Sequence, residues 1–191
     1  MGPMTPSWDR GILTVAAFLV LGVLQAPPPL QAQETLSPEH ERIDFLVGSW
    51  TTVSQFPDGQ EGTGELEYRW VFDGAWMKVE FQGVPPQGGG GWEAHVMQRW
   101  NPEKEGYEAW VFQAQGPPLL YRGSSPEPGL FRVEYEGEDG VVTGIDYHDM
   151  GDGTVYQENW VLEPEAGERR ITLRTSYEPD SPGGGGAGSH P

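Results

Sequence analysis

Cysteine is absent from the 191 residues of the chain. This absence excludes a disulfide framework, thiolate metal sites and the lipid-modified cysteine of bacterial lipoproteins. A domain without disulfides depends on its hydrophobic core. About 140 residues of folded chain are enough for such a core, because a domain of that size buries about two-thirds of the surface that its unfolded chain exposes.

Positive charge is also scarce. Lys and Arg number 11 against 29 Asp and Glu, which gives a formal net charge of -18. Such a field repels phosphate backbones and anionic membrane surfaces, so nucleic acid is not an expected partner. The main consequence of the charge is solubility outside the cell, and a preference for cationic ligands is the weaker interpretation.

Long hydrophobic runs are scarce as well. The one clear run covers residues 11–24 and is shorter than the roughly 20 residues of a transmembrane helix. Arg10 precedes it, and Leu30-Gln31-Ala32 follows with a small residue at a cleavage position, which is typical of a signal peptide. We predict a signal peptide at residues 1–32, a secreted or periplasmic location, and no stable membrane insertion after cleavage. An uncleaved membrane anchor is the alternative.

The rest of the sequence suits one domain and a tail. We assign the domain to residues 33–178. Residues 179–191 include Gly183–Gly186 and almost nothing apolar, so we predict a disordered Gly-rich tail there. We expect the mature protein to be a monomer.

Alternating polar and apolar residues, dense aromatic residues and recurrent turn residues indicate short antiparallel strands. Before them, Ser37 can cap a short helix that starts at Pro38. The predicted strands are Trp50–Phe56, Thr63–Phe72, Trp76–Gln82, Trp92–Asn101, Tyr107–Gln115, Leu119–Gly123, Leu130–Glu136, Val141–His148, Thr154–Leu162 and Arg170–Tyr177. We predict an all-β, antiparallel up-and-down β-barrel of about ten strands with a short N-terminal helix.

The alternation also predicts which side chains face the barrel interior. Met77 and Phe81 lie on one face of their strand, opposite Lys78 and Glu80, and the apolar face should be inside. For residues 92–101 and 107–115 either face can be inside, and the sequence leaves this open. The predicted ligand-binding residues are Tyr68, Trp70, Met77, Phe81, Tyr135, Tyr156, Glu158 and Trp160.

Glu158 is the charged member of this set. Pairing Trp160 and Leu162 with Ile171 and Leu173 of the last strand places Glu158 among aromatic side chains inside the barrel. A buried, unpaired carboxylate is costly, so Glu158 needs a partner, a proton, water or the ligand. We therefore predict that it is the polar anchor of a ligand. A local β-bulge that turns Glu158 outward is an equally weighted alternative.

Three segments resemble a family of secreted bacterial proteins known as domain of unknown function 1579. They are Phe45–Trp50, Val71–Glu80 and Arg99–Phe112, and the resemblance extends over about residues 36–177. It implies a calycin- or lipocalin-like β-barrel with an internal cavity and no established activity. In related lipocalins an arginine of the last strand packs across the tryptophan of a Gly-x-Trp motif. The resemblance therefore implies a structural closure of the barrel by Gly48, Trp50 and Arg174, with Arg170 as the alternative arginine.

Signatures of enzymes and cofactors are few. There is no Gly-x-Ser-x-Gly, His-Glu-x-x-His or Walker motif, and no Gly-x-Gly-x-x-Gly that follows a strand. Asp146, Asp149 and Asp152 lack the spacing of a calcium loop, so we predict no metal. We also predict no cofactor, with haem bound through His95 as the alternative if that side chain points inward.

The aromatic residues carry the main functional indication. We hypothesise a barrel that binds a small, mostly hydrophobic molecule in its cavity, and we expect binding rather than catalysis. A hydrolase or isomerase that uses a buried Glu158 is the first alternative. The second is an envelope interaction module with a filled core and no ligand, in which exposed Trp76 and Trp92 form the contact surface.

Overall fold

The computed structural model describes residues 36–84, 91–165 and 167–180. The elements are α1 (Pro38–Glu41), η1 (Asp44–Leu46), β1 (Gly48–Gln55), β2 (Glu61–Val71), β3 (Trp76–Val84), β4 (Trp92–Asn101), β5 (Gly106–Gln113), β6 (Leu119–Glu127), β7 (Leu130–Glu136), β8 (Val142–Asp149), β9 (Val155–Leu162) and β10 (Arg169–Pro179). Neither helical segment in these ranges is long and apolar enough to cross a membrane. The predicted signal peptide and the glycine-rich part of the tail lie outside the described residues.

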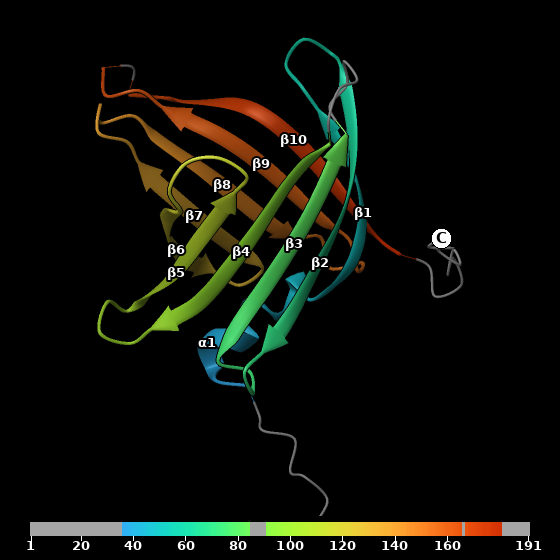
Figure 1. Cartoon of the computed structure of the whole chain (residues 1–191), viewed down its shortest axis with the longest axis vertical. Helices are drawn as coiled ribbons and strands as arrows, with labels where there is room; N and C mark the ends of the chain where they lie inside the picture. The colour runs from blue at the N-terminus through green and yellow to red at the C-terminus, as the bar shows by residue number, and fades with distance from the viewer. Residues whose placement is uncertain (1–35, 85–90, 166, 181–191) are drawn as a thin grey trace, which may run out of the picture. The chain divides into compact units, whose positions relative to one another are not determined.

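The ten strands form a closed barrel in which each strand pairs antiparallel with both neighbours. They follow each other in chain order around the barrel, and β10 pairs with β1 to close it, with Trp50 opposite Pro179 and Gln55 opposite Arg174. Closure leaves no free sheet edge in the barrel. Figure 1 shows the tilted strands around a common axis, with α1 at one end. The prediction of an all-β, antiparallel up-and-down barrel is confirmed.

Short turns explain why consecutive strands are neighbours. Between β2 and β3, Ala75 N donates to Phe72 O at 3.1 Å, and the two central residues of this turn, Asp73 and Gly74, both adopt positive φ. Positive φ at both central residues is favoured in β-hairpin turns because it matches the twist of the strands. The predicted bounds of β4 and β7 agree with the structure, and the other strands differ by a few residues at their ends. Strand β10 includes Pro179, and Asp180 N donates to Ser49 O at 3.0 Å, so ordered pairing continues past residue 178.

The register of β4 against β5 decides the facing that the sequence leaves open. The pairs are Val96 with Val111, Gln98 with Ala109 and Trp100 with Tyr107. All six side chains face the interior, where the first four line a cavity and the last two pack against the core. His95 and Trp110 belong to the alternate positions of these strands and therefore face outward.

The register of β9 against β10 contains a β-bulge. Trp160 pairs with Ile171, but Asn159 pairs with Leu173, so Thr172 is an extra residue on β10. An extra residue moves the side chains beyond it to the other face of the strand. Ile171 and Leu173 therefore lie on opposite faces, and the prediction that they share one face is wrong. Asn159 and Leu173 face the interior, whereas Trp160 and Ile171 face outward.

The helical segment leads directly into the first strand. Ser37 caps α1 as predicted, since its Oγ accepts a hydrogen bond from His40 N at 3.3 Å. After η1, Gly48 has a φ of 148°, which L side chains rarely adopt. This turn brings the indole of Trp50 back under η1, where its Nε1 donates to Leu46 O at 2.9 Å. Trp50 is buried, and it closes this end of the barrel as its Gly-x-Trp context predicts.

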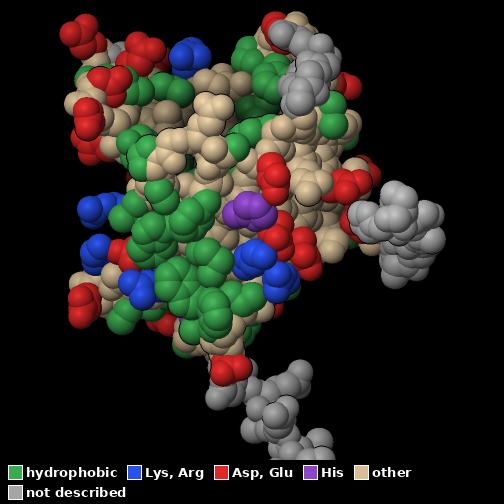
Figure 2. Space-filling view, viewed as in Figure 1, with side chains coloured by type: hydrophobic (Ala, Val, Ile, Leu, Met, Phe, Trp, Pro, Cys, Tyr) green, Lys and Arg blue, Asp and Glu red, His purple; other side chains and the backbone are tan. Residues whose placement is uncertain are grey.

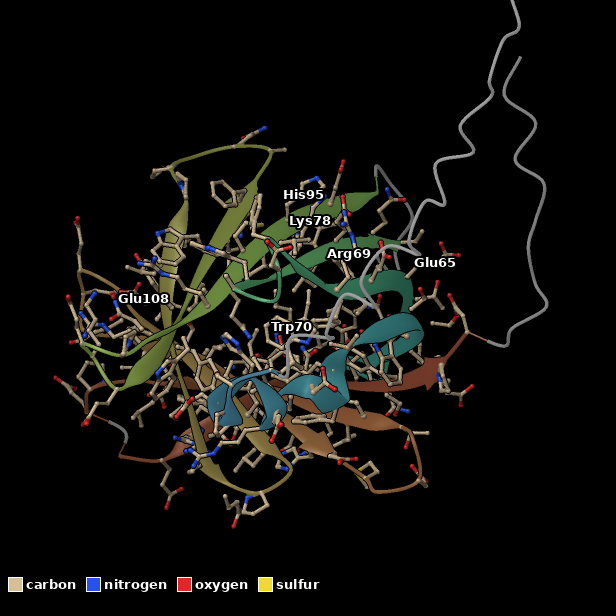
Figure 3. All side chains as sticks on the ribbon, turned by 90° about the horizontal axis from the view of Figure 1, so that it is seen from below. Glu65, Arg69, Trp70, Lys78, His95 and Glu108 are labelled. Carbon is tan, nitrogen blue, oxygen red and sulfur yellow. The ribbon has the colours of Figure 1, made fainter. Side chains whose placement is uncertain are left out.

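Two further strands hold the helical segment against the barrel. Trp70 Nε1 on β2 donates to Asp44 Oδ1 at 2.7 Å, and the Tyr107 hydroxyl on β5 donates to Glu39 O. Figure 3, which views the barrel from this end, shows Trp70 beside the helical segment. Contacts to β1, β2 and β5 therefore fix the helical segment as the closed end, and access to the interior has to come from the opposite end.

Candidate functional site

The barrel encloses a cavity of about 240 Å³ to which all ten strands contribute. Leu46 and Tyr177 lie toward the closed end, and Trp92 lies at the opposite end. Among the described residues, none that lines the cavity carries a charged side chain. The lining residues are Leu46, Thr52, Ser54, Leu66, Tyr68, Val79, Phe81, Trp92, Ala94, Val96, Gln98, Ala109, Val111, Gln113, Tyr121, Phe131, Val133, Ile145, Tyr147, Gln157, Asn159, Leu173, Thr175 and Tyr177.

Polar lining residues are concentrated on three adjacent strands, β1, β10 and β9. We call this surface the polar wall; it consists of Thr52, Ser54, Gln157, Asn159, Thr175 and Tyr177. The Ser54 and Thr175 hydroxyl oxygens are 2.9 Å apart, and Thr52 Oγ1 donates to Gly64 O at 3.1 Å. Strands β3 and β7 line the cavity with apolar side chains alone. The cavity therefore combines a mostly apolar surface with this arc of uncharged hydrogen-bonding groups, and Gln98 on β4 and Gln113 on β5 add two more amides to the lining.

A chain of hydrogen bonds runs along the polar wall. The Tyr177 hydroxyl donates to Gln157 Oε1, and Gln157 Nε2 donates to Asn159 Oδ1. At the closed end, the rings of Tyr147 and Tyr177 contact each other edge to face at a centroid distance of 6.4 Å, and Tyr68 belongs to the same core cluster. Burial is the largest cause that raises the pKa of Tyr68, Tyr147 and Tyr177 well above the usual value of a phenol. These three side chains are therefore neutral hydrogen-bonding groups across the physiological pH range.

Two glycines shape the open end of the cavity. A Cβ on Gly83 would lie 2.5 Å from Cζ of Phe81, and a Cβ on Gly64 would lie 2.8 Å from its Cε2. Both distances are too short for real atoms, so the Phe81 ring can occupy this position only because neither glycine has a side chain. The ring also contacts Trp92 edge to face, with centroids 4.9 Å apart. Phe81 and Trp92 together form an aromatic rim at the open end.

The outer face of β7–β10 carries a separate cluster, formed by Arg132, Asp146, Trp160 and Arg169, that we call the outer cluster. Trp160 is only 2% exposed, although it points away from the cavity. Its indole lies across Gly144, where a Cβ would be 2.1 Å from Cζ2, and Arg169 lies 3.7 Å from the ring centroid. The cluster is thus a tryptophan enclosed between the sheet and two arginines.

Asp146 is the polar centre of the outer cluster. It accepts hydrogen bonds from Arg132 Nε at 2.7 Å and from Trp160 Nε1 at 2.9 Å. Burial by itself would raise the pKa of this carboxyl, but the hydrogen bonds from Arg132 and Trp160 outweigh burial and hold its pKa below the usual value. Asp146 is therefore a structural anion.

The structure divides the eight predicted ligand-binding residues into three groups. Tyr68 and Phe81 line the cavity. Three others lie inside the barrel without lining the cavity, since Met77 is buried in the core, Trp70 lies at the closed end and Tyr135 contacts the cavity residue Tyr121. The remaining three face outward and are Tyr156, Glu158 and Trp160.

The prediction that Glu158 is a polar anchor inside the cavity is wrong. Its Oε1 accepts a hydrogen bond from Arg174 Nε at 3.0 Å on the outer face, next to Tyr156. The physical reason is the extra residue Thr172, which reverses the facing of β9 relative to an unbroken ladder. The bulge considered as the alternative is therefore present, and it lies on the partner strand β10.

Arg174 does not close the barrel over Trp50. Its side chain is 52% exposed and pairs with Glu158 on the outside. Tyr177, three residues further along β10, takes the predicted position instead, with its ring edge to face with Trp50 at a centroid distance of 6.1 Å. The arginine that the sequence resemblance implied at this place is therefore replaced by an aromatic contact from the inner face of the same strand.

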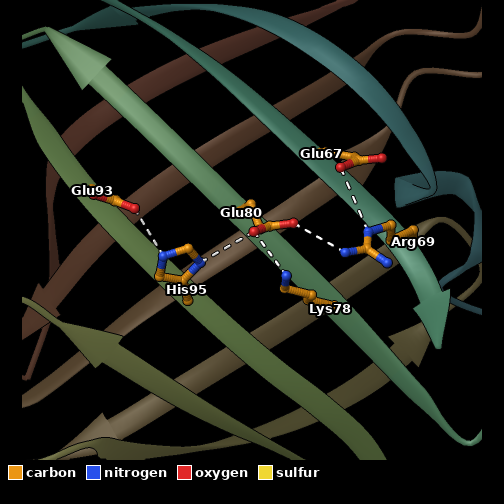
Figure 4. Close-up of polar contacts among 6 residues, drawn as sticks. All are labelled: Glu67, Arg69, Lys78, Glu80, Glu93 and His95. Atoms are coloured by element: carbon orange, nitrogen blue, oxygen red, sulfur yellow. Dashed lines mark hydrogen bonds and ion pairs between the residues drawn. The ribbon is translucent and has the colours of Figure 1, made fainter. Parts of the chain in front are cut away.

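His95 points away from the cavity, so a haem inside the barrel cannot use it as a ligand. Its Nε2 lies 2.9 Å from Glu93 Oε1 and its Nδ1 lies 3.6 Å from Glu80 Oε1. Glu80 also contacts Lys78 and Arg69, at 2.8 and 3.2 Å (Figure 4). In this outer ion-pair network the largest cause that lowers the pKa of Glu80 is the hydrogen bond from Lys78.

The two tryptophans considered as a contact surface lie in different places. Trp76 is on the outer face, where it contacts Trp110 at a centroid distance of 5.5 Å and Arg99 covers both rings at 4.9 and 5.4 Å. Figure 2 shows hydrophobic side chains gathered on this face with basic side chains beside them. Trp92 is 56% exposed but belongs to the cavity rim. Trp76 and Trp92 therefore do not form one patch.

Sequence reasoning missed the main polar groups of the site, Gln157 and Asn159. Their alternation with Tyr156 and Glu158 is visible in the sequence, but alternation alone does not say which face is inside. The choice depends on the register of β9 against β10, which contains the bulge at Thr172 and is not visible in the sequence pattern.

A second hollow of about 560 Å³ lies on the outer face of β1–β4, next to the open end. Glu65, Glu93 and Val84 are among its lining residues, and all three are exposed. Binding sites bury most of the surface of their ligands. The enclosed cavity fits that requirement better than this open surface does, and we take the cavity as the candidate site.

Comparisons with known proteins support the fold alone. No family model matches the sequence, and no match is found among curated proteins. The S-type phycobiliprotein lyase CPES from Guillardia theta aligns with a TM-score of 0.50 and 9% identity, over 81% of this chain and 99% of that one. The structure of EF1p2_mFAP2b bound to DFHBI aligns with a TM-score of 0.36 and 12% identity, over 74% of this chain and 99% of that one. The first of these is similar in overall barrel architecture, and the second contributes no argument.

Proposed function

We propose that this protein binds a small, uncharged and mostly hydrophobic molecule in the cavity of its barrel. The observation that carries the proposal is the lining of the cavity, which combines apolar side chains with neutral hydrogen-bonding groups and includes no charged side chain among the described residues. Moving a charged ligand from water into such a site would cost far more free energy than contacts with uncharged side chains can supply. The volume of about 240 Å³ limits the ligand to a small molecule.

The two ends of the barrel support a single direction of entry. One end is closed by the helical segment, which Trp50, Trp70 and Tyr107 hold through hydrogen bonds. The other end carries the rim formed by Phe81 and Trp92. A ligand would therefore enter past the rim, and Trp92 would report its arrival because an indole changes its fluorescence when a bound molecule replaces water.

The alternative of a hydrolase or isomerase in this cavity depended on Glu158 as the catalytic acid or base. Glu158 lies on the outer face, in contact with Arg174. General acid and base catalysis needs a titratable group within hydrogen-bonding reach of the reacting atoms. We therefore favour binding over catalysis.

The proposals on location, oligomeric state and family come from the sequence. The pattern of residues 1–32 supports a protein that is secreted or delivered to the periplasm, and we propose that the mature protein is a monomer. We also propose membership of the family known as domain of unknown function 1579, on the resemblance of its three segments. An apolar carrier or sensor in an extracellular compartment is consistent with all three proposals.

A neutral fluorescent probe tests the function directly. N-phenyl-1-naphthylamine should bind the purified residues 33–191 with a rise in its fluorescence, and natural ligands should displace it. Val111→Phe fills the cavity from β5 and should weaken binding at least tenfold, because the new ring occupies the space that the probe needs.

The control places the same substitution on an exposed position. Val84→Phe adds a ring to β3 at a residue that is 57% exposed and does not line the cavity, so the affinity for the probe should not change. Equal affinity in both variants would place the probe elsewhere and refute binding in the cavity. A flat titration with the unmodified protein would refute it as well.

A further inference from the structure

The geometry points to a more specific ligand class: a neutral molecule with a hydrogen-bond acceptor, such as a ketone, ester or amide carbonyl, which takes a hydrogen bond from Asn159 Nδ2. The inference rests on the proposed function, because it places that acceptor in the same cavity. It goes further in naming the polar group of the ligand, the atom that recognises it and the chemical classes that are rejected.

The first step is the direction of the hydrogen-bond chain on the polar wall. A hydroxyl group has one proton to donate. The Tyr177 hydroxyl donates that proton to Gln157 Oε1, and Gln157 Nε2 then donates to Asn159 Oδ1. Because each amide accepts on its oxygen and donates from its nitrogen, the two bonds point the same way, from the closed end of the barrel toward the open end.

The second step is the free end of the chain. Asn159 lines the cavity, and its Oδ1 is occupied by the bond from Gln157. Within residues 36–84, 91–165 and 167–180, no group accepts a hydrogen bond from Asn159 Nδ2. An amide nitrogen has two N–H donors. The chain therefore ends in a donor group that faces the space where a ligand would lie.

The third step is the strength of that donor. Hydrogen bonds that point the same way polarise one another, which strengthens the last donor of a chain. A low-dielectric cavity increases the effect, and it also raises the cost of leaving the donor without a partner. A carbonyl oxygen satisfies the donor, whereas a hydrocarbon leaves it unpaired and an ammonium group would oppose it with its own N–H donors.

The fourth step is the position of Asn159 on the barrel. It lies on β9, next to Leu173 of β10 and Ile145 of β8, which also line the cavity. Its donor is thus flanked by aliphatic side chains rather than by competing acceptors. A ligand would place one acceptor against Asn159 and its apolar body against these neighbours and the apolar lining of β3 and β7.

Two compounds of nearly equal shape test the inference. Benzophenone carries a carbonyl acceptor, and diphenylmethane lacks it. Each would displace N-phenyl-1-naphthylamine from the purified protein, and benzophenone should bind about tenfold more tightly, the effect of roughly one good hydrogen bond in a buried site. The infrared carbonyl stretch of bound benzophenone should also move to lower wavenumber than in hexane, a measurement that needs no variant.

Variants then connect the preference to the residue. Asn159→Leu keeps the approximate volume and removes the donor, so both compounds should bind equally. Glu158→Gln is the matched control, since it changes the adjacent residue on the outer face and should keep the tenfold preference. Gln157→Leu breaks the chain before its last donor, and it should reduce the preference without abolishing it.

The outcomes separate this inference from the proposed function. If the unmodified protein binds the probe but benzophenone displaces it no better than diphenylmethane, the cavity binds ligands and the inference is overturned. An unshifted carbonyl stretch of bound benzophenone overturns it as well. If the probe does not bind at all, the proposed function itself has failed.

Discussion

The two faces of strand β9 carry different kinds of polar chemistry. On the outer face, Glu158 pairs with Arg174 and Trp160 donates to Asp146, so the polar contacts involve full charges. On the inner face, Gln157 and Asn159 form a chain of neutral amides. The difference follows from the cost of burying charge, because the outer carboxylates keep water or a cationic partner, whereas a neutral amide can be buried at a much lower cost when it is hydrogen-bonded.

The two faces also differ in what their polar groups leave available. In the outer cluster the Asp146 carboxylate is occupied by Arg132 and Trp160, so it stabilises the sheet and offers little to a partner. On the inner face the chain ends at Asn159 with its Nδ2 group facing the cavity. Under the proposed function, one side of this strand contributes to stability and the other side to ligand recognition.

The largest effect is expected when the outer cluster is opened. Trp160→Ala removes a fully buried indole from between the sheet and Arg169, and it should lower the free energy of unfolding by about 3–5 kcal/mol. Urea unfolding monitored by circular dichroism measures the loss. Trp92→Ala at the exposed rim is the control and should cost far less. A loss below about 1 kcal/mol for Trp160→Ala would show that the outer cluster is not a main source of stability.

A pH titration should separate the inner face from the outer face. Burial raises the pKa of Tyr68, Tyr147 and Tyr177, so the folded protein keeps these phenols protonated while the unfolded chain ionises. Stability from this source is complete below about pH 10 and is lost as the pH rises further, at up to about 1.4 kcal/mol per pH unit for each tyrosine.

Urea unfolding between pH 8 and pH 11 measures this slope. Tyr147→Phe removes one of the three phenols, so the stability of the variant should decline less steeply with pH than that of the unmodified protein. Equal slopes in the two proteins would mean that Tyr147 ionises as readily in the folded barrel as in the unfolded chain.

The smallest effect is expected for the exposed pair on β9 and β10. Glu158→Gln removes the charge that Arg174 contacts, but both side chains reach solvent, so the midpoint of thermal unfolding should move by less than about 2 °C. The affinity for N-phenyl-1-naphthylamine should stay the same. A large loss of probe binding in Glu158→Gln would restore Glu158 as a cavity residue and contradict the facing of β9.

Much of the fold could be predicted from alternation and turn residues. The bounds of β4 and β7, the cap at Ser37 and the inward facing of Tyr68 and Phe81 agree with the structure. These features depend on neighbours within a few residues of each other. The polar half of the site could not be predicted in this way, because it depends on which face of β9 is inside.

The sequence by itself determined the class of fold, since ten short alternating segments without cysteine and with turn residues between them favour an up-and-down barrel. Tertiary structure decided which side chains line the cavity. The extra residue Thr172 on β10 turns Glu158 outward and Asn159 inward, and only the pairing of β9 with β10 reveals it. Either set of alternate side chains on a strand can face the interior, and a shift of one residue in register exchanges the two sets. The local sequence pattern therefore does not decide between them until the strand is paired with its neighbour.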